Sequence, residues 1–242
     1  MALRFRGTID HWDPALLDVL ASEHDVIVFD NVGTGRSTGN APTTIGGLAE
    51  GLLKFADALG LEQVDLFGWS LGGIVVQAAT LLRPNFVRRL VVAGSTPGGV
   101  PDMPAPADKV WQVAGKPVSD DEDFLYLFFP ETEAARQAGL ASLRRLDTRL
   151  DDSHVAVSPE AIRAQLAAIG SLDSAIWDRL GELELPVLVA NGAHDVMISA
   201  YASYAMAERL PDAKVILYSD AGQGFLFQHA EEFGREVLDF LR

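Results

Sequence analysis

The sequence predicts an α/β fold in which a mostly parallel sheet carries helices on both faces and a helical cap is inserted. Short runs rich in Val, Ile and Leu alternate with helical patterns along most of the chain, and this alternation stops between residues 95 and 180. Parallel strands need long crossover connections, which are usually helices. We therefore expect one α/β core over 1–94 and 181–242, with a helical cap over 95–180.

Five runs have the length and composition of buried strands. Turn residues bound each run, and the runs lie at 25–30, 63–67, 87–93, 186–191 and 213–218. Between them, apolar residues spaced as on one helix face predict a helix over 45–59, which Gly60 closes. A second helix is predicted over 202–210, directly before Pro211. These elements together give the sheet and the helices that cover it.

The predicted cap opens with glycines and prolines and continues as several short helices. Ser158 and Pro159 have the residue types of an N-cap and a first helical position. The apolar run FLYLFF at 124–129 either fills the interior of the cap or lines a lipophilic pocket below it. We favour the interior, with some side chains serving both purposes.

Composition excludes several kinds of partner and chemistry. Nineteen basic against thirty-four acidic residues give a formal charge of −15, which opposes binding to nucleic acids and to anionic membranes. The chain has no cysteine, and no pair of its histidines has metal-site spacing. We expect no metal, no other cofactor, no nucleic acid and no membrane partner, and a cytoplasmic location.

The pentapeptide GWSLG at 68–72 carries the chemistry. It joins a predicted strand to a helical run, which is the setting of a serine nucleophile. Gly68 and Gly72 leave room for a tight turn around Ser70, and the N–H of Leu71 at the helix start can stabilise an oxyanion. A glycine-rich turn with an incidental serine is the alternative. The strand before it and the helix after it favour the nucleophile.

Further motifs accompany this serine, and a glycine-rich turn at 30–37 is one of them. That turn is no phosphate loop, because Thr38 stands where a third glycine is needed and no Gly-Lys-Ser/Thr follows. With the pentapeptide, the chain resembles the serine-nucleophile branch of the α/β-hydrolase superfamily over essentially its whole length. The remaining segments that carry the resemblance are HWDP at 11–14, PVLVANGAHDVM at 186–197 and DAGQGFLFQ at 220–228.

The resemblance implies an α/β-hydrolase fold and a catalytic triad in the order serine, acid, histidine. Ser70 takes the place of the nucleophile and Asp195 that of the acid, whereas Gln223 stands where the family has its histidine. A primary amide cannot carry a proton between serine and carboxylate, although it can form a hydrogen bond with either. We rate His229, His194, His11, His24 and His154 as poor replacements for this base.

A second departure from the family lies at the N-terminus. The strands that usually come first are missing, so that Leu3 and Arg4 take the place of a His-Gly pair and Phe5 that of the second oxyanion donor. A sheet that lacks a central strand has unpaired edges, which promote association. Truncation relative to the family, pairing of residues 1–6 into the gap, and a strand from another chain are the three explanations, and the last implies a homo-oligomer.

Three functional hypotheses follow. The first is a serine hydrolase for small carboxylic esters or related acyl compounds, impaired because Gln223 replaces the base. The second is a non-hydrolytic member that uses the pocket for binding, or for chemistry that needs no proton relay, with Gln223 donating a hydrogen bond to the ligand. The third is a fragment or pseudoenzyme that associates through its exposed sheet edge. We favour the first for the class of chemistry.

Overall fold

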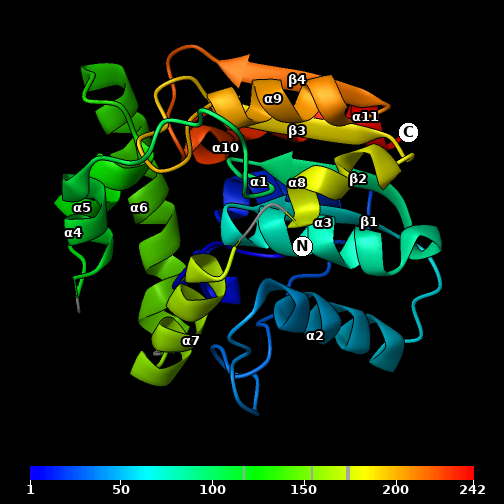
Figure 1. The fold of residues 1–242 in the computed structure, drawn as a ribbon. Coiled ribbons are helices and arrows are strands. Elements are labelled where there is room, and N and C mark those ends of the chain that lie inside the picture. The colour runs from blue at the N-terminus through cyan, green and yellow to red at the C-terminus, as the bar shows by residue number, and fades with distance from the viewer. Residues whose placement is uncertain (117, 154, 173–174) are drawn as a thin grey trace.

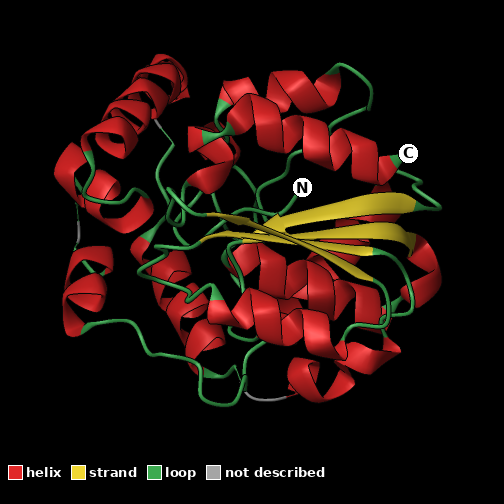
Figure 2. Ribbon diagram, turned by 90° about the horizontal axis from the view of Figure 1, so that it is seen from above, coloured by secondary structure: helices red, strands yellow, loops and turns green. Residues whose placement is uncertain are grey.

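A parallel sheet forms the centre of the molecule. The computed structural model describes residues 1–242 except 117, 154 and 173–174, and within them the sheet has four strands in the order β1-β2-β3-β4. These strands are β1 (Val64–Trp69), β2 (Val87–Ala93), β3 (Val187–Gly192) and β4 (Ala213–Tyr218). Figure 2 shows the sheet edge-on with helices above and below it. The predicted α/β architecture is confirmed.

Two clusters of buried side chains hold the helices against the sheet. The first cluster joins one face of the sheet to α2 (Ile45–Ala58), α3 (Leu71–Leu82), α8 (Ala175–Arg179) and α9 (Tyr201–Arg209). The second cluster joins the other face to α1 (Pro14–Ala21), α10 (Phe225–Gln228) and α11 (Ala230–Leu241). No helix in the described part of the chain combines the length and the apolar composition that crossing a membrane requires.

Local signals locate most elements correctly. The strand predictions at 87–93 and 213–218 match β2 and β4, and those at 63–67 and 186–191 match β1 and β3 within two residues. Helix α2 ends at the predicted place, where Gly60 has φ +68°. The side chain of Ser158 accepts a hydrogen bond from the N–H of Ala161, as expected of an N-cap.

The strand prediction for 25–30 is wrong. This segment is irregular and lies beside the N-terminus, whose amino group donates to the carbonyl of Ile27 at 2.6 Å. Residue Ala2 reaches β1 through one parallel bridge to Gly68, accepting from the N–H of Trp69 at 3.0 Å and donating to the carbonyl of Phe67 at 2.8 Å. The 25–30 segment therefore receives one hydrogen bond from the N-terminal residues. A strand needs a ladder of such bonds, and this one bond does not form it.

A groove lies between β1 and the 25–30 segment, and Met1 is one of the residues that line it. Its volume is about 340 Å³, and mainly apolar side chains line it, among them Ile27, Phe29, Val64 and Phe67. Because Ala2 pairs with only the carboxyl end of β1, the rest of that edge faces this groove. Pairing of the first residues into the gap is thus confirmed for Ala2 alone.

The cap stands at the carboxyl ends of the strands. Figure 1 shows α4 (Asp108–Ala114), α5 (Asp121–Phe128), α6 (Glu133–Ser153) and α7 (Pro159–Gly170) grouped on that side of the sheet. Helices α4, α5 and α6 share the second cluster with α1 and α10. The cap helices and the core therefore share one cluster of buried apolar side chains.

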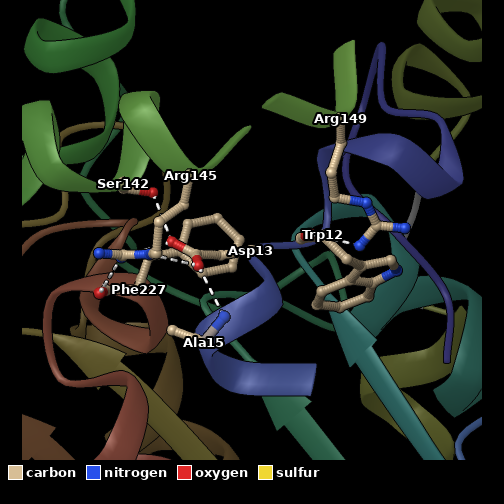
Figure 3. Close-up of polar contacts among 7 residues, drawn as sticks. All are labelled: Trp12, Asp13, Ala15, Ser142, Arg145, Arg149 and Phe227. Atoms are coloured by element: carbon tan, nitrogen blue, oxygen red, sulfur yellow. Dashed lines mark hydrogen bonds and ion pairs between the residues drawn. The ribbon is translucent and has the colours of Figure 1, made fainter. Parts of the chain in front are cut away.

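One ion pair fastens the cap to the core. The buried carboxylate of Asp13, at the N-cap of α1, accepts from the N–H of Ala15, from the hydroxyl of Ser142 and from two nitrogens of Arg145. Figure 3 shows Ser142 and Arg145 reaching down from α6 to this carboxylate. On the same helix, Arg149 donates to the carbonyl of Trp12 at 3.3 Å. These bonds fix α6 over the start of α1.

Candidate active site

Ser70 lies at the junction of β1 and α3 in a strained backbone conformation. Its φ of +57° and ψ of −122° fall outside the regions that residues with a side chain normally adopt. Strand β1 ends at Trp69 and helix α3 begins at Leu71, so that Ser70 alone forms the turn. This is the strand-turn-helix geometry that the sequence predicts for a nucleophile.

The glycines around Ser70 are required for close backbone contacts. A Cβ atom on Gly68 would lie 2.3 Å from the carbonyl oxygen of Gly72, and one on Gly72 would lie 2.1 Å from that of Ala2. Among the described residues, no hydrogen bond uses the N–H of Leu71 or that of Phe5, the two donors expected for an oxyanion. Both groups remain available to a ligand.

Asp195 occupies the turn after β3 and has two different carboxylate oxygens. Its Oδ1 accepts from the N–H groups of Met197 at 2.8 Å and Ile198 at 3.0 Å. Its Oδ2 is buried and has no partner in the part of the chain that the structure describes. Burial raises the pKa of this carboxyl to about 7, against the smaller opposing effect of the two N–H donors.

Gln223 follows β4 and is fully buried. Its side-chain Nε2 donates to the backbone carbonyl of Gly94 at 3.0 Å. Its backbone carbonyl accepts from the indole N–H of Trp69 at 3.1 Å. Its Oε1 is buried and finds no partner among the described residues. The amide is therefore committed to the backbone after β2, and forms neither of the contacts with Ser70 or Asp195 that the sequence allowed.

The three residues share one edge of the sheet without direct bonds between their side chains. The backbone after β2 connects two of them, because the N–H of Ser70 donates to Ala93 and the amide of Gln223 donates to Gly94. The loop of Asp195 contacts the loop of Gln223 through a bond from the N–H of His194 to the carbonyl of Ala221 at 2.9 Å. The structure thus brings the expected positions to neighbouring loops.

Ser70 borders a cavity of about 200 Å³ between the core and the cap. Phe124, Leu127 and Phe128 of α5 form its apolar wall, so the run at 124–129 both fills the interior and lines the pocket. The N-terminal part of the chain contributes Arg4, Phe5, Arg6 and His11 to the same cavity. Sequence reasoning assigned neither Arg4 nor His11 to the site, and the only signal was the unusual Leu3-Arg4 pair in a motif position.

The histidines of the described chain do not supply the missing base. His11 borders the cavity, yet its Nδ1 lies 3.0 Å from the N–H of Thr8 and burial lowers its pKa to about 3. His229 is bonded to Asp220 at 2.9 Å and stacks on Tyr218, and His194 is exposed. His154 lies outside the described residues. No side-chain hydrogen bond joins any histidine of the described chain to Ser70 or Asp195, so none of them takes the position of a triad base.

Comparison with known proteins identifies the family of the chain. A family model described as the alpha/beta hydrolase fold matches residues 5–230. The chain belongs to the α/β-hydrolase family. This α/β-hydrolase is similar to a protein named "Putative carbamate hydrolase RutD" from Caulobacter sp., with 28% identity over 240 residues that cover 97% of this chain and 87% of that protein.

Solved structures of α/β-hydrolases also match the whole chain. An alpha/beta hydrolase fold protein from Chitinophaga pinensis has a TM-score of 0.89 and 34% identity, and the match covers 100% of this chain and 89% of that one. The enol-lactonase from Burkholderia xenovorans LB400 has a TM-score of 0.79 at 18% identity, covering 99% of this chain and 89% of that one. The second likeness shows the fold alone.

Proposed function

We propose that this α/β-hydrolase acts on small carboxylic esters or related acyl compounds through an acyl-enzyme on Ser70, and that Gln223 impairs the reaction. The observation that carries the proposal is the strained turn that presents Ser70 to the cavity under the cap. A serine that a fold holds at positive φ at such a junction is typical of a nucleophile. The cavity is small, which suits a compound of low molecular mass.

The reaction begins when the hydroxyl oxygen of Ser70 attacks the acyl carbon. The carbonyl oxygen then becomes an oxyanion, and the unused N–H groups of Leu71 and Phe5 are the donors for it. The positive end of helix α3 lies beside the same oxygen, since Leu71 is the first residue of that helix. These groups can stabilise the tetrahedral intermediate without a base.

The proton of Ser70 is the weak point of the reaction. A triad histidine accepts it and later returns it to the leaving group, whereas the amide of Gln223 has no basic nitrogen. Removal of the base from a serine triad costs on the order of 10⁴ to 10⁶ in turnover. Turnover by this chain should therefore be slow.

Similar proteins support an acyl substrate. The relative from Caulobacter bears the name of a carbamate hydrolase, and a carbamate carries a carbonyl that is attacked as an ester carbonyl is. The identity of 28% supports the class of reaction and leaves the substrate itself to experiment.

Ligand binding without hydrolysis is the second candidate. The observation that favours it is the bond between the amide of Gln223 and the carbonyl of Gly94, which holds the side chain away from any role in proton transfer. In that case the cavity binds an acyl compound and releases it without hydrolysis.

Substitution Gln223→His tests the proposal. We expect the wild-type chain to hydrolyse 4-nitrophenyl esters of short acids slowly, and Gln223→His to raise kcat by at least about 100-fold because general-base catalysis returns. The double variant Ser70→Ala, Gln223→His is the control and should lose this gain. Steady-state release of 4-nitrophenol measures all three proteins.

A fluorophosphonate probe gives an independent reading. It should label the wild-type chain slowly at Ser70 and the Gln223→His variant much faster, as intact-mass spectrometry with peptide mapping can follow. Rapid labelling of the wild type would contradict the claim of impairment. Absence of any gain in hydrolysis by a folded Gln223→His variant would favour the second candidate.

A further inference from the structure

The cavity beside Ser70 has a charge that contrasts with the rest of the chain. The whole sequence carries a formal charge of −15, yet the described residues that line this cavity include two arginines and no aspartate or glutamate. Arg4 and Arg6 both come from the short segment that precedes the turn at Gly7. A positive wall in an acidic protein points to an anionic ligand.

Arg4 is the less compensated of the two. Its guanidinium lies over the rings of Trp69 at 5.9 Å and Phe128 at 5.2 Å, and its Nη1 donates to the carbonyl of Phe5 at 2.9 Å. No carboxylate in the described chain forms an ion pair with it. Burial, together with the charge of Arg6, lowers its pKa to about 10, so that it remains a cation at neutral pH.

The neighbours of Arg4 already have other partners. Asp30 borders a small adjoining cavity that Arg4 also lines, but its two oxygens accept from the N–H groups of Ile9 at 2.8 Å and Arg36 at 3.1 Å. The Nη1 of Arg6 is bonded to the cap carbonyls of Ala114 and Lys116, which fixes its charge at the rim. A desolvated guanidinium that lacks a counter-ion is costly unless a ligand supplies one.

We propose that Arg4 binds a carboxylate of the substrate, which makes the substrate an acyl compound with a second, free carboxylate. This inference rests on the proposed function for its acyl part, and on the cavity alone for its anionic part. A guanidinium recognises a carboxylate through paired N–H donors, and a charge-assisted bond of this kind contributes about 10- to 100-fold in affinity. The aromatic rings below the guanidinium hold it in place for that contact.

Direct binding tests the anionic part without any turnover. Pentanoate and pentanamide have the same chain and differ in charge, and isothermal titration calorimetry compares their affinities for the full chain. We expect wild-type protein to bind pentanoate at least about 10-fold more tightly than pentanamide. Equal affinities would overturn the proposal, and this comparison needs no variant that could fail to fold.

Variants then assign the preference to a residue. Arg4→Gln should reduce the preference for pentanoate to within about twofold, and Arg4→Lys should retain part of it. Arg136→Gln, at an exposed ion pair on α6, is the control and should bind as the wild type does. If Arg6→Gln abolishes the preference while Arg4→Gln preserves it, the assignment to Arg4 is wrong.

Hydrolysis tests the acyl part. In the Gln223→His background, kcat/KM for mono-4-nitrophenyl glutarate should exceed that for 4-nitrophenyl pentanoate by at least about 10-fold, and Arg4→Gln should remove the difference. Binding of pentanoate without hydrolysis of either ester would refute the proposed function and leave the anion site standing. Hydrolysis of both esters at the same rate would refute the anion site and leave the proposed function standing.

Discussion

At Asp195, one carboxylate oxygen accepts two backbone N–H groups while the other is buried without a partner among the described residues. Burial outweighs the two donors, and the pKa of about 7 is far above the ordinary value of 3.8. In a complete triad an imidazole N–H would donate to such an oxygen. Asp195 therefore keeps its proton to a higher pH than an ordinary aspartate does.

This pKa predicts a change of stability with pH. The folded chain holds the proton of Asp195 between about pH 4 and 7, where the unfolded chain has released it. The contribution of Asp195 to the free energy of unfolding is thus complete below about pH 4 and is lost as the pH rises through about 7. A shift of about three pKa units corresponds to a contribution of a few kcal/mol.

Comparison with Asp195→Asn isolates that contribution. The asparagine keeps an acceptor for Met197 and Ile198 but does not titrate. The free energy of unfolding of the wild type minus that of the variant should therefore fall as the pH rises from 4 to 8. Urea denaturation at several pH values measures it. A difference that stays constant over this range would show that the carboxyl has an ordinary pKa.

At the scale of elements, helix α6 contacts the core through a buried ion pair. Asp13 is fully buried and Arg145 is about one-third exposed, so the pair lies mostly out of water. Removal of one partner leaves the other charge buried and uncompensated. The same helix also carries Arg136, whose pair with Glu122 is exposed on both sides.

These two arginines form a matched pair for mutation. Arg145→Met should lower the free energy of unfolding by roughly 3 kcal/mol or more, because Asp13 loses its counter-ion. Arg136→Met should change it by less than about 1 kcal/mol, since exposed ion pairs contribute little. Chemical denaturation of both variants checks this, and equal losses would mean that the bonds of Asp13 to Ser142 and Ala15 suffice for it.

Element prediction failed where pairing decided the outcome. The run at 25–30 has the composition of a strand, but a strand also needs a neighbour, and Met1 supplies one hydrogen bond at this place. Local signals such as the strained turn at Ser70 and the N-cap at Ser158 depend on few residues, and the sequence predicted both. The ion pair of Asp13 with Arg145 joins residues 132 positions apart, and no local pattern could indicate it.

The same reasoning applies to the site. Motif positions predicted where Ser70, Asp195 and Gln223 would lie, because each lies in the turn or loop that follows a core strand. The positions of Arg4 and His11 depend on how the N-terminal segment folds under the cap, which spacing along the chain does not reveal. The bond of Gln223 to Gly94 depends likewise on a contact between loops.

At the scale of the whole molecule, the groove beside β1 is mainly apolar and lies along a strand edge that is only partly paired among the described residues. It has a volume of about 340 Å³ and is open along the edge of β1 that Ala2 does not pair. Unpaired strand edges with apolar surroundings promote association between chains. We therefore expect this protein to self-associate at high concentration.

A charge placed in the groove should oppose that association. Ile27 lines the groove and is 37% exposed, whereas Leu82 is 53% exposed at the end of α3, away from this groove. Ile27→Lys should shift the protein toward monomer, and Leu82→Lys should have little effect. Size-exclusion chromatography with light scattering over a range of concentrations checks both, and a wild-type protein that stays monomeric throughout would rule out association.

The indole of Trp69 has a consequence for spectroscopy. It is fully buried, and its N–H donates to the backbone carbonyl of Gln223. The guanidinium of Arg4 lies over its ring. A cation over an indole perturbs its excited state, so any ligand that moves Arg4 should alter the emission of this one tryptophan. An intrinsic fluorophore therefore lies directly behind Arg4, a residue of the cavity wall, and can report occupancy in real time even if the protein turns over too slowly to be followed by its products.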